Sequence, residues 1–90
     1  MSHAVMVQVR IAPDSDASHR HAVLSDALVP EAKALPGFVK ALWLNDGVGT
    51  GTCVVVFDTE EDALSAVGAL TPEGGPAVLG VAVCAVEAEA

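Results

Sequence analysis

Apolar and polar residues alternate at the start of the chain, and this pattern predicts a β-strand with two unlike faces over residues 5–11. The apolar set occupies every second position: Val5, Val7, Val9 and Ile11. Residues 14–16 follow Pro13 as a polar turn, and each of the three could cap a helix. Apolar residues at helical spacing then extend to Leu35, and we expect Pro30, which lacks an N–H, to kink or divide this helix near Leu28.

The second half of the chain repeats this alternation of strand and helix. Pro36-Gly37 ends the first helix, and strands over 38–44 and 52–57 flank a Gly-rich connection short enough for a hairpin. Asp58 and Thr59 are cap candidates before three consecutive acids, which predicts a helix over 60–70. Breakers at Thr71-Pro72 and over 74–76 end that helix, and a last strand follows over 78–86.

The element order is therefore βαββαβ, the split βαβ or ferredoxin-like α+β fold, in one domain over residues 1–90. We expect a four-stranded antiparallel sheet with both helices on one face. Right-handed crossovers place the first and third strands in the centre and the second and fourth at the edges.

The other face of this sheet is too apolar for a surface in water. Residues 53–57 and 78–86 contain only apolar residues or Gly, without the alternation of a half-exposed strand. Exposing this face would leave about 300 Å² of aliphatic surface in water, worth about 7 kcal/mol. We expect a second copy of the chain to cover it, giving a homodimer. The competing interpretation is that Val and Ala are simply abundant and the face stays partly exposed.

Composition narrows the class of protein. Hydrophobic residues make up 52% of the chain and charged ones 18%, which excludes intrinsic disorder. A net charge of −8 opposes binding to nucleic acid or to an anionic membrane. Without a membrane-length apolar run or a secretory signal, we expect a soluble, cytoplasmic protein. Cys53 and Cys84 lie on strands separated by the first strand, so we expect small buried hydrophobes and no disulfide.

Three stretches carry a resemblance to a known family: LPGFV over residues 35–39, the single Trp43, and VVVFDTEEDA over residues 54–63. With them the chain resembles the dimeric α/β barrel superfamily, and within it the antibiotic-biosynthesis-monooxygenase-like domains. The resemblance implies two sheets packed face to face as a homodimeric α/β barrel. It also implies a relation to oxygenases that need no cofactor. The haem-degrading branch fits less well, because its second helix carries an iron-binding His and residues 59–70 contain none.

In the polyketide oxygenases of this group, Asn, Trp and Arg surround a pocket between the sheet and the helices, and Trp43, Asn45 and Arg10 are the residues this chain offers. An indole can stack on a planar ligand and donate its N–H to a carbonyl oxygen. Asn45 shares the face of Trp43 if the strand persists. The alternatives are that Trp43 fills the core or the dimer interface and that Asn45 serves a local turn.

His19 and His21 are the candidate bases, because imidazole accepts a proton near neutral pH. Two residues apart on a helix, they point in different directions, which disfavours a metal site. With Arg10 and Arg20 they gather positive charge where the first strand meets the first helix, which could receive a carboxylate, phenolate or phosphate. A solvated helix face and charge balance against neighbouring aspartates are the competing interpretations.

The residues and the resemblance together favour a cofactor-independent monooxygenase acting on a small aromatic or quinol-like compound. No nucleotide, flavin or metal motif is present, and the Gly47-x-Gly49-x-Gly51 run precedes a strand, so we expect no phosphate cradle. The alternative is a non-catalytic dimer that binds a small hydrophobic ligand or has a structural role.

Overall fold

The structure of the chain is a computed structural model, which describes residues 1–71 and 77–90. Its elements follow in the order β1 (His3–Arg10), α1 (Ala17–Val23), the π-helical segment η1 (Leu24–Leu28), α2 (Val29–Lys33), β2 (Phe38–Asn45), β3 (Thr50–Phe57), α3 (Glu60–Leu70) and β4 (Val78–Ala85). The predicted breakers at residues 72–76 lie outside the described residues. No helix in the described ranges is long and apolar enough to cross a membrane.

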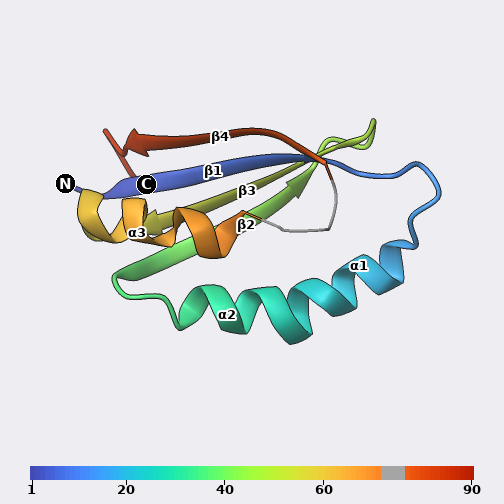
Figure 1. Cartoon of the computed structure of the whole chain (residues 1–90), viewed down its shortest axis with the longest axis horizontal. Coiled ribbons are helices and arrows are strands. Elements are labelled where there is room, and N and C mark those ends of the chain that lie inside the picture. The colour runs from blue at the N-terminus through green and yellow to red at the C-terminus, as the bar shows by residue number, and fades with distance from the viewer. Residues whose placement is uncertain (72–76) are drawn as a thin grey trace.

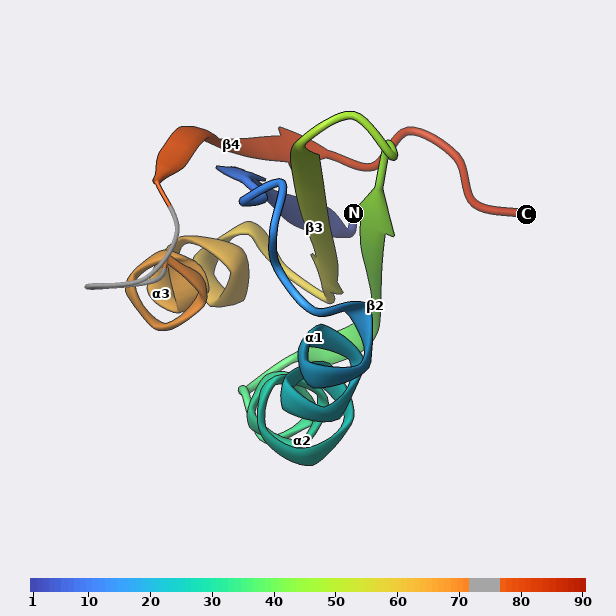
Figure 2. The ribbon, with the colours of Figure 1, turned by 90° about the vertical axis from the view of Figure 1, so that its right-hand side faces the viewer.

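The four strands form one antiparallel sheet in the order β2-β3-β1-β4. The helical run from α1 to α2 and the helix α3 lie on the same side of this sheet (Figures 1 and 2). The predicted ferredoxin-like arrangement is therefore confirmed, with the first and third strands in the centre. We call the two faces of the sheet the helix side and the open side.

The core lies between the central strands and α3. Val5, Val55 and Phe57 are fully buried on the helix side, and Ala63 and Ala66 of α3 pack against them. These alanines allow the helix to approach the sheet closely. The helix begins at Thr59, whose hydroxyl accepts a hydrogen bond from the backbone N–H of Asp62 at 3.1 Å. The prediction of a helix over 60–70 is confirmed. The Thr59 cap and the acidic first turn stabilise the start of this helix.

The helix is distorted in the turn that precedes Pro30. Asp16 caps α1 by accepting a hydrogen bond from the Ser18 N–H at 2.9 Å. The helix then widens into η1, where the Val29 N–H bonds to the Leu24 carbonyl five residues back. This wider turn accommodates a proline ring that would clash with the carbonyl four residues before it in a regular α-helix. The predicted division near Leu28 is thus a π-helical turn within a continuous run (Figure 1).

Strand register assigns each residue to a side. The directly paired residues Val7, Cys53, Trp43 and Val81 share the helix side with the core. Irregularities between Phe38 and Lys40, and between Gln8 and Val9, reset the alternation in β2 and β4. The open side carries the intervening residues: Ala4, Met6, Gln8, Arg10, Lys40, Leu42, Leu44, Thr50, Thr52, Val54, Val56, Gly80, Ala82 and Cys84.

The residues after β4 cover one end of the open side. The Val86 N–H bonds to the Ser2 carbonyl at 2.8 Å, and the segment then passes from β4 toward β2 and beyond it (Figure 2). Ala4 and Val56 line a hollow together with this segment and are buried, although they lie on the open side. The chain therefore covers part of the open side itself, and the expectation that a second copy covers this face stays a prediction. We call residues 86–90 the tail.

Candidate functional site

Trp43 lies on the helix side of the edge strand β2. It pairs directly with Cys53, which in turn pairs with the core residue Val7. The Trp43 side chain is half-buried, and within residues 1–71 and 77–90 no hydrogen bond involves its indole N–H. A partly exposed ring with a free donor can stack on a planar ligand and donate to its oxygen.

Asn45 is the last residue of β2 and shares the helix side with Trp43. Its amide oxygen accepts a hydrogen bond from the Gly47 N–H at 2.8 Å, which is the local turn role that the Asn-Asp-Gly sequence also predicts. The next residue, Asp46, accepts from the N–H groups of Val48 and Thr50 at 2.8 and 3.0 Å. The side-chain NH2 of Asn45 is therefore the part that a ligand beside Trp43 can use.

Arg10 lies on the other side of the sheet. Arg10 pairs with Thr50, and the preceding pair, Val9 with Gly51, faces the helices. Because successive residues of a strand alternate between the two faces, the Arg10 side chain projects from the open side. The structure thus brings together Trp43 and Asn45, but separates Arg10 from them by the sheet itself. The alternation of β1 carries this information, since Arg10 is out of phase with the apolar set of that strand.

The helix α1 lies on the helix side near the end of the sheet at which β2 ends (Figure 1). His19 and His21 are both exposed, whereas Arg20 between them is half-buried, as is Leu24 one turn later. The Arg20 guanidinium donates to the Ser15 carbonyl at 2.9 Å and to the Ser15 hydroxyl. Arg20 is thus the cation on the less exposed side of α1, with the two histidines flanking it.

Sequence reasoning placed Arg20 in a basic cluster but did not choose it as a site residue. The signal that could have singled it out is its spacing of four from Leu24, which puts both residues on one helix face. The two hydrogen bonds from Arg20 hold Ser15, at the end of the loop from β1, against the start of α1.

Cys53 forms part of the sheet surface beside Trp43. Burial raises the pKa of the Cys53 thiol to about 11, so the group is a neutral thiol at neutral pH. It therefore contributes a soft, apolar surface and no nucleophile. Cys84 is exposed on the open side, which corrects the prediction that both cysteines are buried; both are free.

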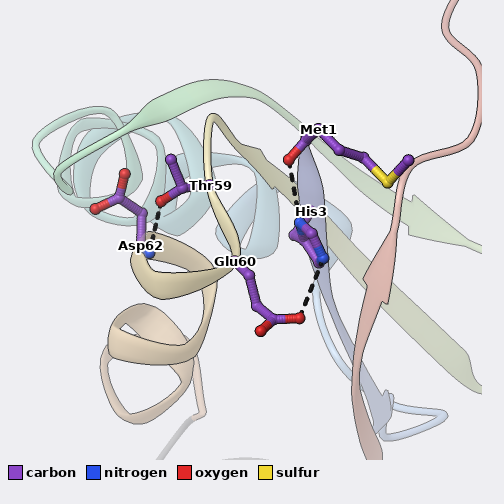
Figure 3. A network of polar contacts seen from close by, with 5 residues as sticks. All are labelled: Met1, His3, Thr59, Glu60 and Asp62. Atoms are coloured by element: carbon purple, nitrogen blue, oxygen red, sulfur yellow. Dashed lines mark hydrogen bonds and ion pairs between the residues drawn. The ribbon is translucent and has the colours of Figure 1, made fainter.

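A second polar group lies at the far end of the helix side, at the start of β1 (Figure 3). His3 Nε2 contacts the Glu60 carboxylate at 3.3 Å, and His3 Nδ1 lies 3.2 Å from the Met1 carbonyl oxygen. His3 is four pairs along the sheet from Val7, so this contact joins β1 to the first turn of α3 and lies away from Trp43. In the described part of the chain, no three His, Cys, Asp or Glu side chains gather as a metal site.

Two hollows lie on the open side. The larger, of about 310 Å³, lies between the tail and the strand residues around Lys40, Leu42 and Val56. The smaller, of about 210 Å³, lies over Met6 and Gln8 beside Gly80 and Ala82. Both are bounded mainly by small or aliphatic side chains, and neither includes Trp43 or a histidine.

Comparison with known proteins bears on the fold. No family model and no curated protein sequence matches the chain. Among solved structures, the chain is similar to that of a "putative Antibiotic biosynthesis monooxygenase from Chloroflexus aurantiacus J-10-fl", with a TM-score of 0.61 and 16% identity. The match covers 100% of this chain and 98% of the other. At this identity the likeness establishes the fold alone, and it confirms the ferredoxin-like arrangement that the sequence predicts.

Proposed function

We propose that the chain is a cofactor-independent monooxygenase, in which a small electron-rich aromatic or quinol-like compound binds against Trp43 on the helix side of the sheet. The observation that carries the proposal is the half-buried indole on β2, whose N–H has no hydrogen-bond partner within residues 1–71 and 77–90. The fold is similar over the full length of the chain to that of a putative antibiotic biosynthesis monooxygenase. A planar, oxygen-bearing ring fits both properties of this side chain.

In this proposal, Trp43 and Asn45 of β2 hold the substrate, and residues of α1 supply charge and a base. The indole stacks on the ring, and the NH2 of Asn45 donates to a ring oxygen. Arg20 supplies the positive charge that stabilises the phenolate or enolate once a proton has left. Of the flanking histidines, His21 or His19 takes that proton, as a neutral imidazole can.

The chemistry balances without a cofactor for a substrate with an activated ring CH2, such as anthrone. The base removes one proton, and the resulting carbanion transfers electrons to molecular oxygen. A C–O bond forms, the O–O bond breaks, and the CH2 group becomes C=O while the second oxygen atom leaves as water. The protein's part in this sequence is to orient the ring and hold the anion.

We further propose that the working form is a homodimer joined through the open side. Leu42 and Leu44 lie on this side and are 58% and 52% exposed, next to the aliphatic surface of β1 and β3. The tail leaves both leucines in water, and a second copy of the same face would cover them.

Oxygen uptake with anthrone and with hydroquinone tests the reaction. We expect turnover by the unmodified chain, retention of most activity in Trp43→Phe, and loss of at least about tenfold in kcat/KM in Trp43→Ala, because Phe preserves stacking. His21→Ala and His19→Ala identify the base by loss of kcat with a changed pH profile. Leu64→Ala, an exposed substitution on α3, is the control.

Non-catalytic binding is the second candidate, and the exposure of both histidines favours it. Because Trp43 is the only Trp, its fluorescence reports directly on this site. Quenching by an aromatic compound without oxygen uptake would support a binding protein. The absence of both oxygen uptake and fluorescence quenching would refute the assignment of the site.

A further inference from the structure

The open side has three bands across the strands, and each differs in chemistry. The first is covered by the tail, which brings the exposed acids Glu87 and Glu89 to the end of the sheet near Ala4. The middle band is apolar and contains Met6, Val54, Leu42 and Ala82. The last band carries a cation, Arg10, beside the polar residues Gln8, Thr50 and Thr52, with Leu44 at its β2 edge.

Charge on this side is unusual for the chain. The chain has a net charge of −8, yet none of the four strands contains Asp or Glu. Two of the four Lys and Arg residues, Lys40 and Arg10, lie on the open side. Lys40 lines the same hollow as Glu89, so it has an acid nearby in its own chain. Arg10 is exposed at the opposite end, and the single ion pair among the described residues does not involve it.

Glu87 and Glu89 do not neutralise Arg10 within one chain. The Ala4 and Arg10 positions of β1 are six residues apart, or about 20 Å along the strand. The tail crosses the sheet at the Ala4 end and continues past β2, away from Arg10 (Figure 2). An end where Glu87 and Glu89 outnumber Lys40, an apolar middle and an end with Arg10 therefore face the same way on one surface.

Such a surface is complementary to itself under one kind of two-fold axis. An axis that reverses the strand direction places the acidic end of each copy on the basic end of the other and joins the two apolar middles. The alternative axis, parallel to the strands, places acids on acids and Arg10 on Arg10, which is unfavourable. We propose that the homodimer adopts the first arrangement, in which the tail of each copy binds Arg10 of the other copy. The inference rests on the homodimer of the proposed function and adds its orientation and its polar contacts.

The sharpest test is a reversal of the acidic end. In Glu87→Lys/Glu89→Lys the net charge changes from −8 to −4, so general repulsion between the copies falls and would tighten the dimer. The proposed contact has the opposite consequence, because Lys then faces Arg10. We expect the dimer dissociation constant, measured by sedimentation velocity at low salt, to rise about tenfold. Asp26→Lys/Glu31→Lys on the first helical run makes the same charge change and is the matched control.

Rescue completes the experiment. Arg10→Glu should also weaken the dimer, whereas the triple variant Arg10→Glu/Glu87→Lys/Glu89→Lys should restore it to within about threefold, because the pair is then inverted. All of these differences should shrink as salt is raised toward 0.5 M. A dimer that is unaffected by the tail reversal, or not rescued in the triple variant, would overturn the orientation and leave the dimer intact. A chain that is monomeric in every variant would instead overturn the dimer.

Discussion

Leu42 offers the most direct measurement of what the open side does. Its side chain is 58% exposed in the single chain, which leaves roughly 100 Å² of apolar surface in water. Covering it in both copies of a dimer gives about 5 kcal/mol at 25 cal/mol per Å², an upper estimate. Leu42→Asn removes most of this gain and places an amide in the apolar band. We expect the dimer dissociation constant to rise at least 30-fold, or about 2 kcal/mol.

Leu64 on α3 is a matched control, since it is the same residue type and is 56% exposed, away from the sheet. Leu64→Asn should leave the dissociation constant within about twofold. Both variants should unfold in urea at nearly the unmodified midpoint when measured below the dissociation constant, because neither side chain contributes to the buried core. Equal sedimentation of Leu42→Asn, Leu64→Asn and the unmodified chain across micromolar concentrations would refute the role of the open side.

Three further predictions concern single residues. Gly37 has φ of 76°, and a Cβ there would clash with the Asp62 carboxylate, so Gly37→Ala should lower the free energy of unfolding by more than about 1 kcal/mol. Gly68→Ala in α3, where space is open, should instead raise the free energy of unfolding by about 0.5 kcal/mol, and urea unfolding measures both. Below the dimer dissociation constant, where the open side is uncovered, Cys84 should react with a disulfide reagent much faster than Cys53. The pKa of about 11 leaves about one part in a thousand of Cys53 as thiolate at pH 8, and equal rates would contradict the burial of Cys53. Hydrogen bonds from the Thr50 and Val48 N–H groups hold the pKa of Asp46 below its ordinary value. The contribution of Asp46 to stability is therefore present above about pH 4 and is lost as the pH falls through the lower pKa of the folded state. The difference in Tm between the unmodified chain and Asp46→Ala should narrow from pH 6 to pH 2.

The fold could be predicted because local signals and topology agree. Thr59 and the acids after it mark the start of α3, and Pro36-Gly37 marks the turn into β2. The handedness of crossovers then leaves one strand order, which the sheet has. Pro30 was located correctly as a disturbance, but its form was not predictable, because whether a helix breaks, kinks or widens at proline depends on how its next turn packs.

The site was harder to predict because it depends on register. Regular alternation from Phe38 would put that residue and Trp43 on opposite sides of the sheet, whereas the irregularity before Lys40 puts both toward the helices. A bulge of this kind leaves no clear mark in the sequence. The tail differs, because its sequence does carry a signal: Val86, Ala88 and Ala90 alternate with acids, as in a strand with one apolar face. The segment is short and directly follows the last strand, so this signal is easily overlooked.

Two adjacent residues of β2, Leu42 and Trp43, lie on opposite sides of the sheet and have different proposed roles. The Leu42 side chain projects from the open side, where we place the second copy. The Trp43 side chain projects from the helix side, where we place the aromatic ligand. Both depend on the same edge strand, which has a hydrogen-bonded neighbour on one side only. A partner packed on the open side would restrict the motion of β2 and so hold the indole in position for a ligand. If this coupling exists, Leu42→Asn weakens ligand quenching of Trp43 fluorescence in proportion to the monomer it creates, whereas Trp43→Phe leaves the dimer dissociation constant unchanged.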